Sequence, residues 1–448
     1  MEKFFKLKEN GTDVKTEILA GITTFFTMAY IIFVNPTILA DAGMDKGAVM
    51  IATCIAAFIG TMLMGLLANL PFALAPGMGL NAYFAYTIVI QMGYSWQAAL
   101  AAVFLSGIIF IALSVSGIRE GIIKALPFTL KKAIGGGIGL FIALIGLLST
   151  GIIVADPATT VAFGEFNQPV VILTLISLVI TIVLVVKNVK GALLIGMIVA
   201  TLLGYAAQAI GIDVGIAVTS SGSASLTPTL FKFVEGFGDL FNASQGFGVL
   251  LFSIISILIS LTMVDMFDTI GTLIGAASKG NLLDKDGNLP NASKALLADA
   301  IATSVGAALG TSTTTTFVES SAGIAQGGKT GLTACTTAVL FLVSIFAAPL
   351  LGFIPSYATY MVLIVVGIMM MSPIKEIDWE NLEEAIPAFF TLVIMPFAYS
   401  IADGIAFGCI SYCIVKTACK KTKEIHPAMW IICVLFIIRY IIPYINIV

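Results

Sequence analysis

Long apolar runs separated by short polar breaks recur along the whole chain, and they constrain its fold more than any other feature. Most runs are close to the 20 or so residues that a helix needs to cross a bilayer. Only 10% of the 448 residues are charged and 59% are hydrophobic, whereas soluble domains carry roughly 25% charged residues. Membrane β-barrel strands would show a weak two-residue alternation in place of continuous runs. The sequence therefore predicts an all-α polytopic membrane protein.

The runs fall into two sets of seven, separated by a polar, Gly/Ser-rich stretch at 213–245. The first set lies near residues 17–40, 48–70, 77–93, 95–118, 127–150, 169–187 and 191–212, and the second near 248–278, 293–310, 316–328, 331–350, 356–374, 383–401 and 403–419. An odd number of crossings turns the second set over, so an internal repeat would be inverted. We expect about 14 segments in a 7+7 inverted repeat. The last run, 427–448, carries Arg439 and is expected to lie along the membrane or pack on the bundle, with a fifteenth crossing as the alternative.

Positive charge indicates the orientation. Lys and Arg gather on the cytoplasmic side of membrane proteins, and basic residues flank the first and fourth runs: Lys3, Lys6, Lys8, Lys15, Arg119, Lys124, Lys131 and Lys132. The opposite side receives acidic residues: Asp41, Asp156, Glu165, Asp213 and Asp239. We expect a multi-pass protein of the cell (plasma) membrane with a cytoplasmic N-terminus.

Other composition features exclude several classes of partner. The net charge is −3 with no basic stripe, so nucleic acid is not an expected partner. The six cysteines show no CxxC spacing, so neither a metal site nor a disulfide framework is expected.

The third and tenth runs are interrupted. Pro71, Pro76, Gly77 and Gly79 break the third, and the β-branched run 311–318 gives the tenth a short strand-like start. Non-helical backbone at membrane depth survives only where protein or a water-filled cavity satisfies it. Paired breaks at matching positions of two inverted halves indicate a central binding site. The alternative is a pair of kinked packing helices.

Carboxylates mark the predicted site. Asp268 lies inside the eighth run, and Glu319 follows the strand-like start of the tenth. Charged groups at membrane depth mostly face a cavity and belong to substrate or ion paths. Ring N–H groups of a ligand could donate to both carboxylates, and protonation of Asp268, Glu319 or the nearby Asp265 could couple a proton to transport. The alternatives are a helix-packing carboxylate for Asp268 and a helix cap for Glu319.

Further residues complete the predicted substrate-binding set. Asn81 offers amide donors and an acceptor that suit a heterocyclic edge, although an Asn that bridges two helices is the alternative. Aromatic side chains could stack on a flat ring, but they fill ordinary cores more often; the candidates are Phe26, Tyr83, Phe84 and Phe317. The set that we expect to contact substrate is Asp268, Glu319, Asn81, Phe317, Val318, Ser320, Phe26 and Gly79.

Four segments resemble the nucleobase/ascorbate transporter superfamily, in its adenine/guanine/hypoxanthine permease branch. They are GITTFFTMAYIIFVNP, PFALAPGMGLNAYF, DMFDTIGTLIG and TSTTTTFVESSAGIAQGGKTGLTA. The resemblance implies a core of segments 1–4 and 8–11, and a gate of segments 5–7 and 12–14. The corresponding boundaries are 1–118 and 246–350 for the core, and 119–245 and 351–448 for the gate.

The resemblance also implies a substrate. Asp268 and Glu319 match the purine-contacting acids of that branch, and Asn81 matches its polar residue in the third segment. Uracil-type relatives place a glutamate where Asp268 stands and a histidine at the place of Thr272, so their proton coupling does not transfer directly.

The leading hypothesis is purine uptake by symport with H⁺, with Na⁺ as the alternative coupling ion, by alternating access between core and gate. No cofactor and no enzymatic activity are expected, and a homodimer is a possible assembly. A pyrimidine, xanthine or anion transporter of the same fold is the alternative, and a passive channel is less favoured.

Overall fold

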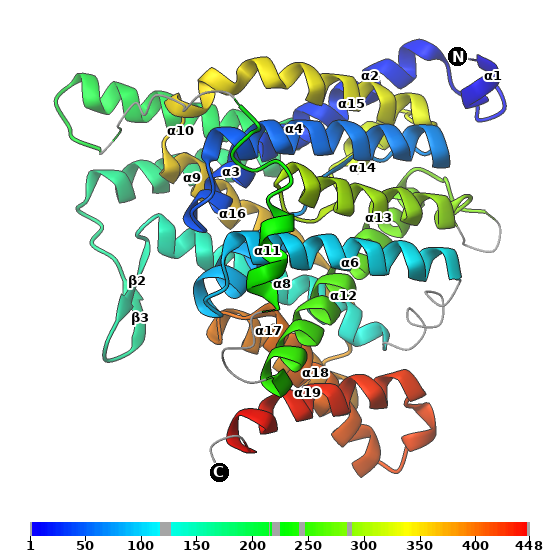
Figure 1. Ribbon diagram of the computed structural model, residues 1–448. Helices are drawn as coiled ribbons and strands as arrows, with labels where there is room; N and C mark the ends of the chain where they lie inside the picture. The colour runs from blue at the N-terminus through cyan, green and yellow to red at the C-terminus, as the bar shows by residue number, and fades with distance from the viewer. Residues whose placement is uncertain are drawn as a thin grey trace.

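The computed structural model describes residues 2–116, 127–214, 216, 225–241, 247–284 and 289–445. The chain is mostly helical, with two short antiparallel strand pairs (Figure 1). The first half contains α1 (Glu2–Phe5), α2 (Val14–Met28), α3 (Ile31–Asp41), α4 (Lys46–Leu63), the π-helix η1 (Met64–Ala68), β1 (Leu74–Pro76), α5 (Met78–Ala82), the π-helix η2 (Tyr83–Gln91), α6 (Trp96–Ser116), α8 (Phe128–Ser149), β2 (Ile153–Asp156), β3 (Thr160–Phe163), α9 (Pro169–Val186) and α10 (Ala192–Ala209).

The second half is also mostly helical. It contains α11 (Phe233–Leu240), α12 (Phe247–Lys279), α13 (Ala292–Leu309), β4 (Thr314–Thr316), α14 (Ser320–Ala325), α15 (Gly331–Val343), the 3₁₀-helix η3 (Ser344–Phe353), α16 (Ser356–Met370), η4 (Ser372–Glu376), α17 (Leu382–Phe397), α18 (Ile401–Ala418), η5 (Thr422–Glu424) and α19 (Pro427–Ile445).

Eleven stretches of helix within the described residues are long and apolar enough to cross a membrane. Each coincides with one of the fourteen predicted runs. The three other runs fall short for identifiable reasons. Runs 77–93 and 316–328 contain only the short pieces next to β1 and β4, and 383–401 forms α17, a helix of 16 residues with two internal prolines. A multi-pass helical membrane protein is confirmed.

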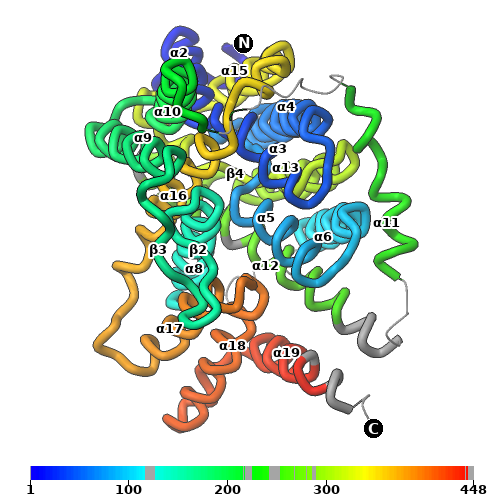
Figure 2. The backbone as a smooth tube through the Cα atoms, turned by 90° about the vertical axis from the view of Figure 1, so that its left-hand side faces the viewer, coloured from blue at the N-terminus to red at the C-terminus, as the bar shows by residue number. Residues whose placement is uncertain are grey.

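Two groups of helices pack mainly within themselves. The crossing group consists of α2–α6 with η1, η2 and β1, and of α12–α15 with η3 and β4; the flanking group consists of α8–α10 and α16–α18. Figure 2 looks along the helices and shows β4 and α5 in the centre, with α3, α4, α6 and α13 on one side and α8 and α16 on the other. The seam between the groups therefore passes beside the broken segments.

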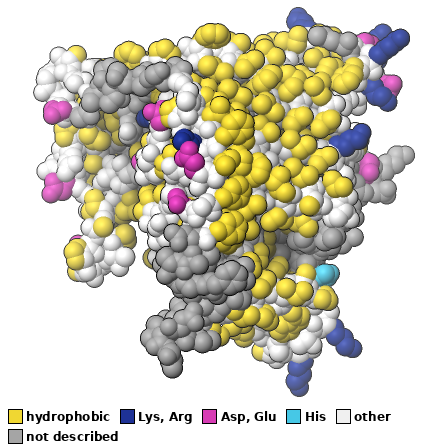
Figure 3. All heavy atoms as spheres, viewed as in Figure 1, with side chains coloured by type: hydrophobic (Ala, Val, Ile, Leu, Met, Phe, Trp, Pro, Cys, Tyr) yellow, Lys and Arg dark blue, Asp and Glu magenta, His cyan; other side chains and the backbone are white. Residues whose placement is uncertain are grey.

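The surface has the character of a membrane protein. Figure 3 shows apolar side chains over the middle of one face, and Lys and Arg mainly at the end that carries the N-terminus in Figure 1. The hairpin β2–β3 lies at the opposite end. The first span runs from Val14 to Asp41, so these two residues mark opposite faces of the protein.

The terminal helix α19 packs against α12 and α18. Tyr440 donates a hydrogen bond to the Asp403 carboxylate of α18 over 2.6 Å, which fixes this packing. The run thus packs on the bundle, which is one of the expected arrangements. The alternative of a fifteenth crossing stays a prediction. The side chain of Arg439 lies outside the described residues.

Candidate functional site

The two broken segments meet through a three-residue strand pair. β1 and β4 are antiparallel, with Leu74 opposite Thr316 and Pro76 opposite Thr314. Further bonds extend the pair at both ends, from the Gly77 N–H to the Thr313 carbonyl (3.0 Å) and from the Phe317 N–H to the Ala73 carbonyl (2.9 Å). All six strand residues are buried. The predicted strand-like breaks are therefore present, and each segment satisfies the backbone groups of the other.

Side chains of neighbouring helices supply the remaining partners of the strands. The Thr61 hydroxyl of α4 accepts from the Leu74 N–H (2.8 Å) and donates to the Leu74 carbonyl (3.0 Å). On the far side, the Thr303 hydroxyl of α13 donates to the Thr314 carbonyl over 3.1 Å. This explains how extended backbone persists at membrane depth, where an unsatisfied polar group is costly.

Asp268 and Glu319 come together beside this strand pair. Asp268 is on α12, and Glu319 lies between β4 and α14. Their carboxylates are near enough for their charges to interact, and both side chains are half-buried. Glu319 makes no capping hydrogen bond to α14, so the capping alternative is excluded.

Tyr30 is a site residue that the sequence reasoning missed. Its hydroxyl donates to Glu319 Oε1 over 2.5 Å, and the ring is almost fully buried. Tyr30 lies at the break between α2 and α3, within the segment GITTFFTMAYIIFVNP. The sequence offered no signal for Tyr30, because the break between α2 and α3 is visible only in the structure.

A second carboxylate pair lies behind the strand. Asp299 of α13 accepts from the Thr269 hydroxyl of α12 (2.9 Å) and from the Thr316 hydroxyl of β4 (3.2 Å). Asp265 accepts from Thr303 over 3.2 Å. Both acids are fully buried, so they hold α12, α13 and β4 together next to Asp268. Asp299 was not among the predicted residues, although it is a charge within an apolar run.

Four predicted site residues are buried in contacts within the protein. Asn81 donates to the Pro76 carbonyl over 3.4 Å, and its own carbonyl accepts a short hydrogen bond from Ser312. Ser320 accepts from the Ala73 N–H over 3.0 Å. The other two are Phe317, which is 6% exposed, and Gly79, which is packed against Ile138.

The remaining two predicted residues are accessible. Val318 is 45% exposed and Phe26 is 48% exposed. The Phe26 carbonyl lies beside Gly191 at the start of α10, which places Phe26 at the seam between the two groups. Thus Asp268, Glu319, Val318 and Phe26 are the accessible members of the predicted set.

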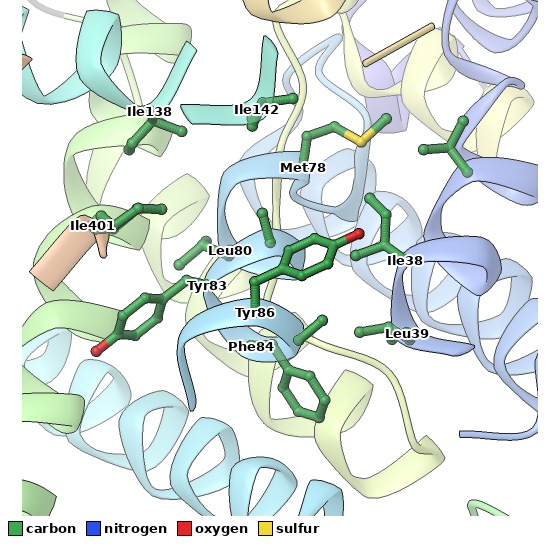
Figure 4. Packing of buried hydrophobic residues seen from close by; sticks show 14 of the residues in the cluster. Ile38, Leu39, Met78, Leu80, Tyr83, Phe84, Tyr86, Ile138, Ile142 and Ile401 are labelled. Atoms are coloured by element: carbon green, nitrogen blue, oxygen red, sulfur yellow. The ribbon is translucent and has the colours of Figure 1, made fainter. Parts of the chain in front are cut away.

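The seam itself is closed around the third segment by apolar side chains. In Figure 4, Tyr86 points toward Ile38 and Leu39 of α3, while Tyr83 points the opposite way. The flanking group contributes Ile138 and Ile142 of α8 and Ile401 of α18, which lie on the other side of Met78 and Leu80 (Figure 4).

These features define a class: a polytopic membrane transporter with a polar site at two crossed, interrupted segments. A family model described as "Permease family" matches residues 15–407. The chain belongs to the nucleobase/ascorbate transporter family. It is a membrane transporter and not an enzyme.

Close relatives extend over nearly the whole chain. The guanine/hypoxanthine permease PbuO of Bacillus subtilis is 46% identical over 443 residues, covering 98% of this chain and 100% of the relative. The adenine permease AdeP of Escherichia coli is 41% identical over 441 residues, covering 98% and 96%.

Solved structures show the same fold at low identity. The transmembrane domain of the cyanobacterial bicarbonate transporter BicA superposes with a TM-score of 0.64 at 18% identity, covering 90% of this chain and 96% of that chain. Murine Slc26a9, an anion transporter in the inward-facing state, gives a TM-score of 0.61 at 12% identity, covering 92% and 69%. At these identities the likeness is one of fold.

Proposed function

We propose that this protein imports purine nucleobases such as hypoxanthine, guanine or adenine, as a secondary active transporter coupled to H⁺, with Na⁺ as the alternative coupling ion. The observation that carries the proposal is the meeting of Asp268 and Glu319 beside the β1–β4 pair. The printed names of the relatives, adenine and guanine/hypoxanthine permeases, support the substrate class.

The chemistry of the accessible side chains suits a purine. Carboxylates accept hydrogen bonds, and the N–H groups along a purine edge can donate to Asp268 and Glu319. Val318 and Phe26 offer apolar surface to the faces of a flat ring. In this proposal Asn81, Phe317, Ser320 and Gly79 form the wall behind the ligand, and Asn81 reaches it when its contact with Ser312 opens.

Two neighbouring carboxylates also provide a means of coupling. Like charges close together in a low-dielectric site repel, so a proton on one of them stabilises the pair. We propose that Asp268 or Glu319 carries the coupled proton, with the buried Asp265 as the second candidate. No cofactor is needed for this cycle.

The architecture supports movement between two bodies. We propose fourteen segments in a 7+7 inverted repeat, with a core at 1–118 and 246–350 and a gate at 119–245 and 351–448. Antiparallel pairing of β1 with β4, each followed by a short helix, is what an inverted relation between the third and tenth segments would produce. The crossing group corresponds to the core and the flanking group to the gate. Alternating access would then be a rocking of these groups along the seam.

The distribution of charge supports the proposed placement. Lys and Arg gather at the end that carries the N-terminus (Figure 3), so we propose a cytoplasmic N-terminus in the plasma membrane. A homodimer is a possible assembly.

Purine uptake into vesicles of purified protein tests the proposal. Radiolabelled hypoxanthine, guanine and adenine are offered under an imposed proton gradient, a sodium gradient or no gradient. We expect gradient-dependent accumulation of at least one purine. Asp268→Ala and Glu319→Ala should abolish it, while Glu165→Ala, an exposed carboxylate in an outer loop, should not. Absence of uptake of every purine under every gradient would refute the proposal.

Competition separates the alternative substrates. Unlabelled hypoxanthine, guanine or adenine should displace the labelled purine, whereas uracil, xanthine and bicarbonate should not. Stronger competition by uracil, xanthine or bicarbonate would reassign the substrate within the same fold, and single-channel currents would favour a passive channel.

A further inference from the structure

A carboxylate joins the crossing group to the flanking group on the face opposite the N-terminus. Asp41 ends α3 at that face. Its Oδ2 accepts from the Tyr86 hydroxyl over 2.6 Å and from the Tyr360 hydroxyl over 2.5 Å. Tyr86 is on η2 of the crossing group, whereas Tyr360 is on α16 of the flanking group. One oxygen atom thus bridges the seam.

Other contacts between the groups lie at the same face. Gln91, at the end of η2, donates to the Ala398 carbonyl over 3.1 Å, and Thr87 donates to the Tyr399 carbonyl over 3.5 Å. The Tyr86 and Tyr399 rings meet edge to face with centroids 6.0 Å apart. The end of η2 is therefore tied to the connection between α17 and α18.

The hydroxyls that bind Asp41 are held in place by buried tyrosine rings. Tyr86 is 6% exposed and Tyr360 is 7% exposed, while the Asp41 side chain reaches the surface. Figure 4 shows the Tyr86 ring directed toward α3, the helix that Asp41 ends. Buried rings hold their hydroxyls in fixed positions, so small displacements between the groups break the hydrogen bonds.

At the candidate substrate site, in contrast to the buried Tyr86 and Tyr360, two side chains are exposed. Phe26 is 48% exposed and lies beside the start of α10, and Val318 is 45% exposed. Phe26 precedes the Tyr30 break and is thus on the N-terminal side of the middle of the first span. The seam is thus joined at the face opposite the N-terminus, and the exposed Phe26 lies in the N-terminal half of the first span.

We propose that Asp41, Tyr86 and Tyr360 form a latch that closes the seam on the face opposite the N-terminus and must open before the site can face that side. The inference rests on the proposed transport cycle and names its outer gating residues. Hydrogen bonds present in only one of two conformations shift the population between them by their differential free energy. Loss of one hydroxyl therefore enriches the outward-open conformation.

Cysteine labelling tests the latch without depending on the substrate. The background carries replacements of the six native cysteines (Cys54, Cys335, Cys409, Cys413, Cys419 and Cys433) and the reporter Ile142→Cys. Ile142 is 1% exposed and lies at the seam on α8 (Figure 4). A membrane-impermeant maleimide is applied to the outer face of right-side-out vesicles.

Tyr360→Phe should raise the initial labelling rate about tenfold, as expected for loss of a hydrogen bond to a charged group. Tyr86→Phe should raise it less, because the Tyr86–Asp41 bond lies within the crossing group and only positions the carboxylate. Asp41→Asn should act in the same direction. Combining Asp41→Asn with Tyr360→Phe should add little, because both changes remove the same bond. The matched control is Tyr357→Phe on the same helix, whose hydroxyl donates to the Ala200 carbonyl inside the flanking group over 2.7 Å. It should leave labelling unchanged.

The outcomes separate the latch from the proposed substrate. Unchanged labelling in Tyr360→Phe, in protein that still imports purines, would overturn the latch alone. Equal acceleration by Tyr357→Phe would also overturn it, because the effect would then be a general loosening of α16. If the variants are labelled faster but the parent protein with an intact latch imports no purine, the latch is supported and the substrate assignment is overturned.

Discussion

At the scale of single residues, the contact between Tyr30 and Glu319 is the most informative feature of the site. A hydroxyl that donates over 2.5 Å orients the carboxylate and stabilises its charge. Hydrogen bonds to charged groups contribute about 1.5–3 kcal/mol, and each 1.4 kcal/mol is about tenfold in an equilibrium constant.

Tyr30→Phe should therefore weaken purine binding by about tenfold or more. Equilibrium binding to purified protein measures this directly, without the transport cycle. The matched control is Tyr440→Phe, which removes another tyrosine-to-carboxylate bond, to Asp403 on α18. An unchanged dissociation constant for Tyr30→Phe would show that Glu319 binds ligand without this support.

Substitution of Asn81 tests whether a buried member of the predicted set contacts substrate. Because its carbonyl accepts from Ser312, Ser312→Ala removes the bridge but leaves the amide. We expect Asn81→Ala to change the order of preference among hypoxanthine, guanine and adenine, and Ser312→Ala to leave that order unchanged. Competition profiles measure both. If the two variants give the same profile, Asn81 is only a bridge between α5 and the segment before β4.

Carboxylates and tyrosines differ in how clearly a sequence marks them, although the buried carboxylate of Asp299 was also missed. Asp268 and Glu319 could be predicted because a carboxylate in an apolar run has a high free energy of burial and therefore indicates a functional site. Tyr30 could not be singled out, since a tyrosine beside phenylalanines is compatible with ordinary packing. The engagement of Asn81 with Ser312 depends on contacts between distant segments that no local pattern contains.

At the scale of elements, the close approach of α5 to α8 sets a steric limit at the seam. A Cβ added to Gly79 would lie 2.4 Å from Ile138 Cγ2, whereas one added to Gly135 of α8 would meet nothing within 4 Å. Overpacking typically costs about 1–3 kcal/mol.

Gly79→Ala should accordingly lower the purine uptake rate by roughly tenfold, because the seam can no longer close around α5. Gly135→Ala is the control and should transport normally. Adding Ile138→Ala to Gly79→Ala should restore much of the rate by making room. Failure of that rescue, with both proteins properly inserted, would assign Gly79 a role in ligand contact or in the backbone of α5.

The sequence predicted the strand-like breaks, since Pro76 and Gly77 stop a helix and 311–318 is β-branched. It did not predict that these strands pair with one another in a given register, because pairing depends on the arrangement of segments far apart in the chain. The hairpin β2–β3 and the helix α11 were also missed, because both lie between the long apolar runs and are too short to register as a run. The π-helical turns of η2 have no local sequence signature.

At the scale of the whole molecule, the seam is joined at the face opposite the N-terminus, and the exposed site residues lie nearer the N-terminal face. Among the described residues, four hydrogen bonds between the groups lie at the joined face: Asp41 with Tyr360, Thr87 with Tyr399, Gln91 with Ala398, and Tyr205 with Phe353. This asymmetry predicts that the site communicates with the N-terminal side in the conformation described here.

Val318→Cys in the cysteine-free background tests this prediction, because Val318 is 45% exposed and adjacent to Glu319. An impermeant maleimide should label it rapidly in inside-out vesicles and much more slowly in right-side-out vesicles. Saturating hypoxanthine, guanine or adenine should slow the labelling, since a ligand held by Asp268 and Glu319 would cover this position. Cys419, which is exposed at the end of α18, serves in the native background as a control that purines should not protect. Equal labelling from both sides would contradict the closed outer face, and labelling that no purine slows would place the ligand away from Val318.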